Sequence, residues 1–363
     1  MIEMEIDTPA LVLDVDVLER NIARMAEYLR GRKSKIRPHV KVHKSPVLAK
    51  KQIAAGAIGI TVAKVSEAEV MAQAGIDDIL IANQIVGEQK LQRLARLAKR
   101  TKLQVAVDNL ENAKQISHFA SQESSNIGIF VELDLGSNLE GILDRSGVSP
   151  GQPATALISE IAKLKNIELR GLMGYEGALR KFTDAKKRRA AVETALGPLV
   201  ETKDQAEDAG FDVPIVSCGG TMSYNISSNF PGVTEIQAGS YVFMDATYLS
   251  YGIDFELALT LWTTIVSRPH ANKAIMDVGY KAISADSGLP KIKDRSEMEV
   301  VALNAEHGHI SSHKQDISCP IGEKLELITT HVDTTTCLHD NYVLTQNGAV
   351  KGNLEIACRG RLQ

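Results

Sequence analysis

The feature that most constrains this chain is an alternation of two kinds of segment between residues 36 and 241. Short runs rich in apolar and β-branched residues alternate with longer amphipathic stretches. The expected strands are Ile36–Lys41, Gly59–Ala63, Asp78–Asn83, Lys102–Asp108, Gly128–Asp134, Glu168–Tyr175, Ile215–Gly220 and Glu235–Tyr241. Nearly continuous apolar strands joined by helices indicate a parallel sheet covered on both faces. Eight such units within about 200–250 residues predict an α/β fold of the TIM type, a (β/α)₈ barrel.

An open, doubly wound sheet is the alternative that the same alternation allows. A dinucleotide-binding sheet of that kind has a glycine-rich turn after its first strand. No such turn follows the first expected strand here, so the barrel is preferred. The spacing of Ser66 and Glu69 predicts a capping box at the start of one helix. The expected helices include Ser66–Ala74, Glu88–Lys99, Leu110–Ala120, Ala154–Lys163 and Thr183–Ala209.

After residue 251 the helical periodicity fades and short alternating runs replace it. The Asn347-Gly348 pair between two such runs is the signal of a type I′ hairpin. We expect a barrel domain over residues 15–250 and an all-β C-terminal domain over 251–363. The early strand Ala10–Asp14 is assigned to the β domain, which then comprises residues 1–14 plus 251–363. The expected C-terminal strands are Trp262–Arg268, Lys273–Val278, Glu297–Leu303, Leu325–Thr330 and the Tyr342–Ile356 region.

The composition is that of a soluble globular protein and excludes several classes of partner. The chain is 44% hydrophobic and 24% charged, with a formal net charge of −4. This charge indicates neither nucleic acid nor an anionic membrane as a partner. The N-terminus is acidic where a secretory signal would be basic. We expect a cytoplasmic protein with reduced thiols, because no metal spacing joins Cys218, Cys319, Cys337 and Cys358.

Ionisable side chains alternate in the segment Arg37-Pro-His39-Val-Lys41-Val-His43-Lys44. On a strand, the period of two would send Arg37, His39, Lys41 and His43 to one face. A lysine held away from water loses solvation, which lowers the pKa of an ammonium group and leaves a nucleophilic amine. A solvated lysine at the edge of a loop is the alternative.

Two glycine turns rich in hydroxyl groups follow the seventh and eighth expected strands. They contain Gly219-Gly220-Thr221 and Gly239-Ser240-Tyr241. Barrels of this type often hold a phosphate after strands seven and eight. Glycines let backbone N–H groups approach an anion, and hydroxyls add donors. A phosphate cradle opposite an imine-forming Lys41 is what pyridoxal phosphate needs, whereas two ordinary tight turns are the alternative.

Motifs spread over nearly the whole chain resemble those of the fold-type III pyridoxal phosphate enzymes, in particular the D-threonine aldolase and D-serine dehydratase group. The motifs are RPHVKVHKS, VELDLG, GLMGYEG, SCGGTMSYN, GVTEIQAGSYVFMD, DVGYKAISAD, AEHGHI and THVDTTTCLHDNYVL. The resemblance implies an alanine-racemase-like barrel with a β domain, and a homodimer with active sites near the subunit interface. It also implies that Lys41 carries the cofactor. Position and resemblance together suggest further cofactor contacts from His39, Tyr175, Gly219, Gly220, Thr221, Gly239, Ser240 and Tyr241.

Two positions depart from the pattern of this family. An arginine usually follows the Asp-x-Gly of strand five closely, but here Ser137–Leu143 precedes Arg145. We interpret Ser137–Leu143 as an insertion and Arg145 as the arginine beside the cofactor's phenolate oxygen, with a surface arginine as the alternative. Glu176 stands where characterised aldolases often carry histidine. The general base is therefore left open among a metal-bound water, His307, His309 and Glu176.

His331 and Asp333 follow the expected strand Leu325–Thr330. Residues two apart on a strand point the same way, so the two side chains could bind one divalent ion, whereas a solvated loop pair is the alternative. The resemblance implies that dehydratases carry His-x-Cys here and bind zinc, whereas aldolases carry His-x-Asp. A carboxylate admits manganese, magnesium or calcium as well as zinc. Cys337 lies out of register for the thiolate role.

These residues lead to the hypothesis of an aldolase that depends on pyridoxal phosphate and a divalent metal. It would cleave D-β-hydroxy-α-amino acids of the D-threonine type to glycine and an aldehyde. A D-serine or D-threonine dehydratase, giving a keto acid and ammonia, is the first alternative. A racemase and a non-catalytic pyridoxal phosphate carrier are the others. The expected catalytic residues are Lys41, Glu176, His331 and Asp333.

Overall fold

The computed structural model describes residues 6–136, 145–177, 182–312 and 318–363, so the proposed insertion Ser137–Leu143 lies outside the described residues. The chain divides into two compact units. The first, here called the barrel unit, comprises Met25–Lys41, Pro46–Gly239 and Arg361–Gln363. The second, here called the β unit, comprises Met1–Arg24, Val42–Ser45 and Ser240–Gly360.

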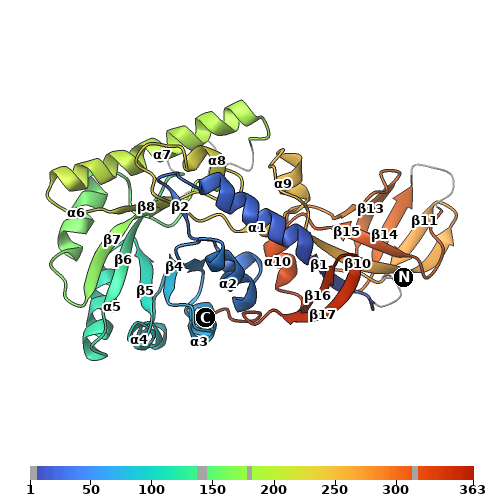
Figure 1. The fold of residues 1–363 in the computed structure, drawn as a ribbon, viewed down its shortest axis with the longest axis horizontal. Coiled ribbons are helices and arrows are strands. Elements are labelled where there is room, and N and C mark those ends of the chain that lie inside the picture. Colours follow the sequence, from blue (N-terminus) through green and yellow to red (C-terminus); the bar gives the residue numbers. More distant parts are fainter. Residues whose placement is uncertain (1–5, 137–144, 178–181, 313–317) are drawn as a thin grey trace. The chain divides into compact units, whose positions relative to one another are not determined.

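The barrel unit contains eight parallel strands in the order β2-β9-β8-β7-β6-β5-β4-β3. A parallel bridge between His39 and Thr61 joins the two ends of this order, and the N–H of Thr61 donates to the carbonyl of Pro38 at 2.9 Å. The predicted eight-stranded barrel is therefore confirmed. Figure 1 labels β2 and β4 to β8 of this sheet. The strands are β2 (Lys35–Ile36), β3 (Ile60–Val62), β4 (Asp78–Gln84), β5 (Lys102–Val107), β6 (Ile127–Leu133), β7 (Ile167–Gly174), β8 (Ile215–Cys218) and β9 (Glu235–Ile236).

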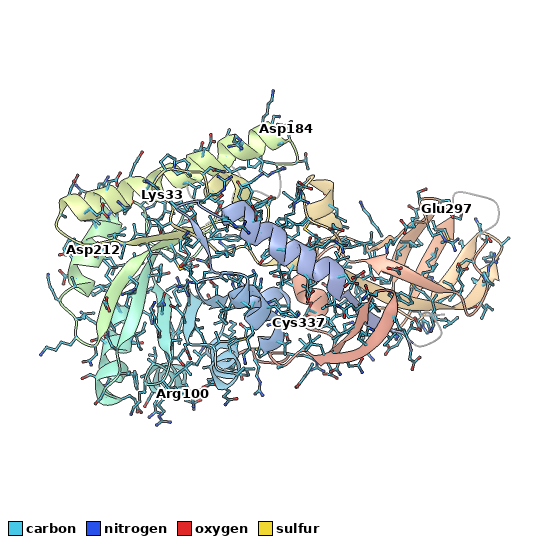
Figure 2. The ribbon with its side chains drawn as sticks, in the orientation of Figure 1. Lys33, Arg100, Asp184, Asp212, Glu297 and Cys337 are labelled. Carbon is cyan, nitrogen blue, oxygen red and sulfur yellow. The ribbon has the colours of Figure 1, made fainter. Side chains whose placement is uncertain are left out.

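A helix follows each of the first seven barrel strands along the chain, and the five predicted helices form within a few residues of their expected bounds. The carboxylate of Asp184 accepts from the N–H of Lys187 at 2.8 Å and so begins α7 (Figure 2). The capping box predicted from Ser66 and Glu69 is wrong, because Glu67 accepts from the N–H groups that precede its helix. The helices are α2 (Pro46–Ala54), α3 (Val65–Gln73), α4 (Glu88–Leu97), α5 (Leu110–Gln122), α6 (Gln152–Ile161), α7 (Ala185–Asp208) and α8 (Tyr224–Ser227).

The strands β2 and β9 are shorter than predicted. β2 ends at Ile36, and a 3₁₀ turn follows at Val40–Val42. Pro38 contributes to the early end of β2, because proline has no backbone N–H to donate to a neighbouring strand. The prediction that Arg37, His39, Lys41 and His43 share one strand face is therefore wrong, since a 3₁₀ turn has about three residues per turn.

The β unit is built on a nine-stranded, mostly antiparallel sheet. β1 (Ala10–Asp14) pairs antiparallel with β10 (Leu259–His270) and parallel with β16 (Asn341–Gln346). Asn347 and Gly348 have φ values of 51° and 69°, so the predicted type I′ turn is confirmed. The remaining strands are β11 (Lys273–Met276), β12 (Lys291–Ile292), β13 (Met298–Leu303), β14 (Gly308–Ser312), β15 (Lys324–Ile328) and β17 (Ala349–Glu355).

Two short helices of the β unit bear on the site described below. They are α9 (Ala246–Ser250) and α10 (Val332–Thr336), and the sequence predicted neither. All four cysteines lie in the described part of the chain, and no disulfide joins any two of them. Within the ranges that the structure describes, no helix combines the length and the apolar character needed to cross a membrane.

Candidate active site

Seven of the predicted cofactor positions follow the carboxyl ends of five neighbouring barrel strands. In the order β2-β9-β8-β7-β6, these ends are followed by Lys41, Gly239, Gly219–Thr221, Tyr175 and Arg145. All barrel strands are parallel, so their carboxyl ends lie at the same end of the barrel, where enzymes of this fold have their active sites. The predicted positions thus form one continuous sector of this rim, which we call the rim sector.

Gly239 is required where the ends of β2 and β9 come together. A Cβ atom on Gly239 would lie 2.3 Å from the carbonyl oxygen of His39, a distance that no side chain could adopt without moving the backbone. His39 in turn bridges to β3. Lys41 follows two residues later in the 3₁₀ turn and is partly buried. The close approach of the two strand ends therefore fixes the backbone from which Lys41 projects.

Glu176 lies buried beneath the Gly219-Gly220 turn and is only 4% exposed. Its Oε1 accepts hydrogen bonds from the hydroxyls of Ser223 and Ser227 at 2.7 and 2.6 Å. Its Oε2 accepts from the N–H of Gly219 at 3.1 Å. The N–H of Gly220 donates to the hydroxyl of Ser223 at 3.1 Å. These contacts favour a positioning role for Glu176, as the anchor of the turn, over the role of general base, for which it was one of four candidates.

Two substitutions of Glu176 separate these roles. Glu176→Ala should lower the free energy of unfolding by about 3 kcal/mol, because each hydrogen bond to a charged group contributes roughly 1.5–3 kcal/mol and loss of a buried charge offsets part of the sum. Thermal unfolding measures this loss, and titration with pyridoxal phosphate should show weaker binding. Glu176→Gln keeps an acceptor and should keep kcat within about tenfold. A loss of about 10²–10⁴-fold in Glu176→Gln with unchanged cofactor binding would instead support a general base.

The segment that carries Arg145 pairs with the end of β6 through Val148, and Arg145 itself is exposed. The N–H of Val148 donates to the carbonyl of Glu132 at 2.9 Å, and the N–H of Asp134 donates to the carbonyl of Val148 at 3.1 Å. The guanidinium carbon of Arg145 lies 5.2 Å from the centroid of the Tyr175 ring, a cation–π contact. Two residues assigned to the cofactor from the sequence are thus neighbours in the structure.

A buried carboxyl group that the sequence motifs do not indicate lies near Arg145. Glu132 is 5% exposed, and burial raises the pKa of its carboxyl above the ordinary value. The side-chain amide of Gln84 donates to its Oε2 at 2.5 Å, and the hydroxyl of Ser146 donates to the same oxygen at 3.2 Å. The one signal in the sequence was an acidic residue inside the apolar strand Gly128–Asp134.

The predicted metal residues, His331 and Asp333, lie in the β unit at the start of α10. β15 ends at Ile328, so neither residue continues a strand. His331 is the N-cap of α10 and has an extended backbone, whereas Asp333 lies in the first turn of this helix. The argument that strand alternation aligns the two side chains is therefore wrong. Their proximity results instead from neighbouring positions at one helix start.

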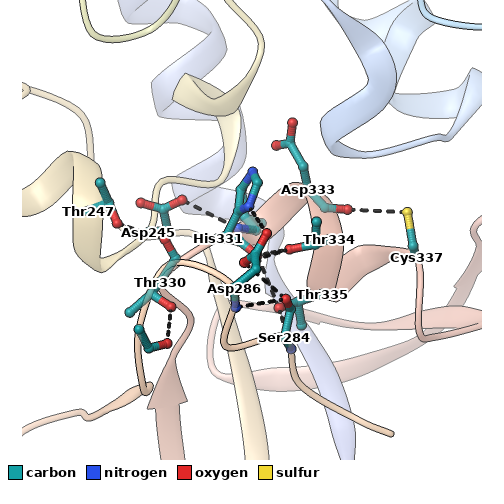
Figure 3. A network of polar contacts seen from close by, with 12 residues as sticks. Asp245, Thr247, Ser284, Asp286, Thr330, His331, Asp333, Thr334, Thr335 and Cys337 are labelled. Carbon is teal, nitrogen blue, oxygen red and sulfur yellow. Dashed lines mark hydrogen bonds and ion pairs between the residues drawn. The ribbon is translucent and has the colours of Figure 1, made fainter. Parts of the chain in front are cut away.

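The imidazole of His331 contacts a carboxylate through its Nδ1 atom. This atom lies 2.7 Å from Oδ2 of Asp286 (Figure 3). Partial burial opposes ionisation of Asp286, but its contact with His331 lowers the pKa of Asp286 below the ordinary value. The imidazole is mostly buried, with 19% of the side chain exposed. The described residues contain no group of three or more His, Cys, Asp or Glu side chains arranged to hold a metal ion.

The remaining predicted residues of the β unit are Ser240, Tyr241, His307 and His309. The hydroxyl of Ser240 lies 3.5 Å from Oδ1 of Asp333, and Tyr241 is buried against Phe255 with ring centroids 5.4 Å apart. His307 is exposed, whereas Nε2 of His309 lies 3.0 Å from the side-chain amide nitrogen of Asn304. The structure therefore groups Ser240 with Asp333.

Comparison with known proteins gives matches over nearly the whole chain. The family described as "Alanine racemase, N-terminal domain" matches residues 13–247, and the "Putative serine dehydratase domain" matches residues 258–345. A 3-hydroxy-D-aspartate aldolase from Paracoccus denitrificans (strain Pd 1222) is 35% identical, with 99% of this chain and 94% of the relative covered. A D-threonine aldolase from Arthrobacter sp is 34% identical, with 98% and 93% covered. The crystal structure of D-threonine aldolase from Filomicrobium marinum matches with a TM-score of 0.95 and 34% identity, over 99% of this chain and 97% of that one.

Proposed function

This chain belongs to the alanine racemase N-terminal domain family, and we propose that it is a pyridoxal phosphate-dependent lyase that cleaves D-β-hydroxy-α-amino acids to glycine and an aldehyde. The observation that carries the proposal is the rim sector, in which Lys41, the two glycine turns, Tyr175 and Arg145 follow five adjacent strand ends. Two relatives that align with almost the whole chain have aldolase names, which supports cleavage as the reaction.

The donors of the rim sector fit pyridoxal phosphate. Lys41 would hold the aldehyde carbon of the cofactor through its ε-amino group, and Arg145 would face the phenolate oxygen. Thr221, which is 2% exposed, would donate to the phosphate. Gly219 and Gly220 would shape this turn, because their N–H groups already donate to Glu176 and Ser223. When bound, the cofactor supplies an electron sink for the pair released as the Cα–Cβ bond breaks.

His331 and Asp333 would hold a divalent cation through Nε2 and a carboxylate oxygen. One imidazole and one carboxylate suit manganese, magnesium, zinc or calcium, and the contact between Nδ1 and Asp286 leaves Nε2 as the coordinating nitrogen. A cation there would supply positive charge that lowers the pKa of the substrate's β-hydroxyl group. His307 and His309 are the remaining side-chain candidates for the group that accepts the hydroxyl proton.

Product analysis tests the proposal. The purified protein is incubated with D-threonine, D-serine and 3-hydroxy-D-aspartate, with and without added divalent metal. The expected products are glycine and the matching aldehyde, formed only in the presence of the metal. Ammonia with a keto acid would identify a dehydratase instead. Interconversion of D and L forms without either product set would identify a racemase, and both results would contradict the proposal.

A further inference from the structure

Asp286, in the β unit, makes polar contacts through both of its carboxylate oxygens. We infer that Asp286 is a positioning residue that fixes the tautomer and the orientation of the His331 ring, so that Nε2 faces the cation. The inference rests on the proposed function only in assuming that His331 binds a divalent cation. In this role, Asp286 contacts neither the cation nor the substrate.

Both oxygens of Asp286 are engaged by the segment around α10. Oδ2 lies 2.7 Å from Nδ1 of His331, and Oδ1 accepts from the hydroxyls of Ser284 and Thr334 at 3.0 and 3.3 Å (Figure 3). The hydroxyl of Thr335 accepts from the N–H of Ser284 at 3.3 Å and donates to the carbonyl of His331 at 3.1 Å. The carboxylate is therefore held from two sides, which fixes its direction toward the imidazole.

The chemistry of this contact determines which nitrogen of His331 can bind a metal. A carboxylate only accepts hydrogen bonds, so Nδ1 must carry the proton and Nε2 must carry the lone pair. A carboxylate in this position also makes the imidazole a stronger ligand, and such partners orient the ring. The described residues do not bring His331, Asp333 and Asp286 together as three metal donors. A positioning role for Asp286 therefore fits better than a role as a third ligand.

The backbone around His331 is held by residues other than Asp286. The buried carboxylate of Asp245 accepts from the N–H of Val332 at 3.3 Å and from the N–H of Tyr248 at 2.9 Å. The hydroxyl of Thr247 donates to the carbonyl of Thr330 at 2.7 Å. Loss of the Asp286 side chain should therefore release the imidazole ring while the start of α10 stays in place.

Two measurements without substrate test the inference. In metal-free full-length protein labelled with ¹⁵N-histidine, long-range ¹H–¹⁵N spectra report the tautomer of His331, whose signals are those absent from His331→Gln. We expect the Nδ1–H tautomer in the unsubstituted protein and a loss of this preference in Asp286→Ala. Titration with Mn²⁺, followed by electron paramagnetic resonance, should show a Kd raised about 10–100-fold in Asp286→Ala, the usual effect of losing such a partner.

Two further variants make the result specific. Asp286→Asn keeps an oxygen that can accept from Nδ1, so it should raise the Kd for Mn²⁺ by less than about tenfold. Asp340→Ala removes an exposed carboxylate that pairs with Arg359 in the same unit, and it should change neither measurement. The inference is overturned by an Nε2–H tautomer in the unsubstituted protein, by an unchanged Kd in Asp286→Ala, or by equal losses in Asp286→Asn and Asp286→Ala. Because no turnover is measured, failure of the aldolase proposal appears separately, in the product analysis.

Discussion

Lys41→Ala is expected to lower kcat for D-threonine by at least about 10²–10⁴-fold, the contribution of a single group that transfers protons in a reaction. The further loss of covalent attachment to the cofactor adds to this effect. The absorbance band of covalently bound pyridoxal phosphate should disappear, and borohydride reduction should label no peptide that contains residue 41. Absorbance spectra and peptide mapping measure both changes directly.

Lys44 provides the matched control, because it belongs to the same motif and is buried, whereas Lys41 is partly buried. Its φ of 51° lies in the left-handed region, which asparagine tolerates, so Lys44→Asn is a better control than an alanine substitution. This variant should keep the cofactor band. Retention of the band in Lys41→Ala, or a borohydride label on Lys44 in the unsubstituted protein, would refute the assignment of Lys41.

The barrel could be predicted because its signal is local and repeated. Buried parallel strands such as β4 (DILIANQ) and β5 (KLQVAV) are rich in apolar residues, and the helices between them show one apolar face. The lengths of β2 and β9 could not be predicted in this way. Beyond their last residues, Ile36 and Ile236, the backbone of Gly239 approaches the carbonyl oxygen of His39, a contact between residues far apart in the sequence.

The rim sector could also be predicted, because the topology of a parallel barrel brings strand ends together whatever their distance along the chain. The contacts that refine the roles of the rim-sector residues could not be predicted from the sequence. Glu176 meets Ser223 and Ser227 across 47 and 51 positions, and its sequence neighbourhood contains no trace of these partners. Only the folded barrel shows that both carboxylate oxygens of Glu176 are already occupied.

The two residues proposed to bind the metal, His331 and Asp333, were predicted to continue a strand, but they lie at the start of a helix. The helix α10 has five residues, VDTTT, of which three are threonines, and threonine has only a modest helix propensity. Nothing periodic could mark so short a helix after a strand. Asp286, which orients His331, lies 45 positions away in the sequence. As with the partners of Glu176, no sequence pattern near His331 indicates this contact.

Asp333→Ala is expected to reduce the turnover of D-threonine by about 10²–10⁴-fold, because the substrate hydroxyl would lose the positive charge that assists its deprotonation. Removal of divalent ions with a chelator should have an effect of the same size. Added Mn²⁺ should restore the chelated protein but not the variant. The cofactor band should persist in Asp333→Ala, which separates this loss from that of Lys41→Ala. Turnover and absorbance, measured on the same samples, provide the comparison.

A double variant shows whether His331 and Asp333 act through one bound ion. Residues that act as a unit give strongly non-additive losses, because removal of either one already abolishes the shared function. His331→Ala combined with Asp333→Ala should therefore lose little more activity than either single variant. Cys337→Ala, one helical turn beyond Asp333, is the control and should keep its activity. Losses that multiply in the double variant, or activity that persists in chelator, would show that the two side chains do not share a cation.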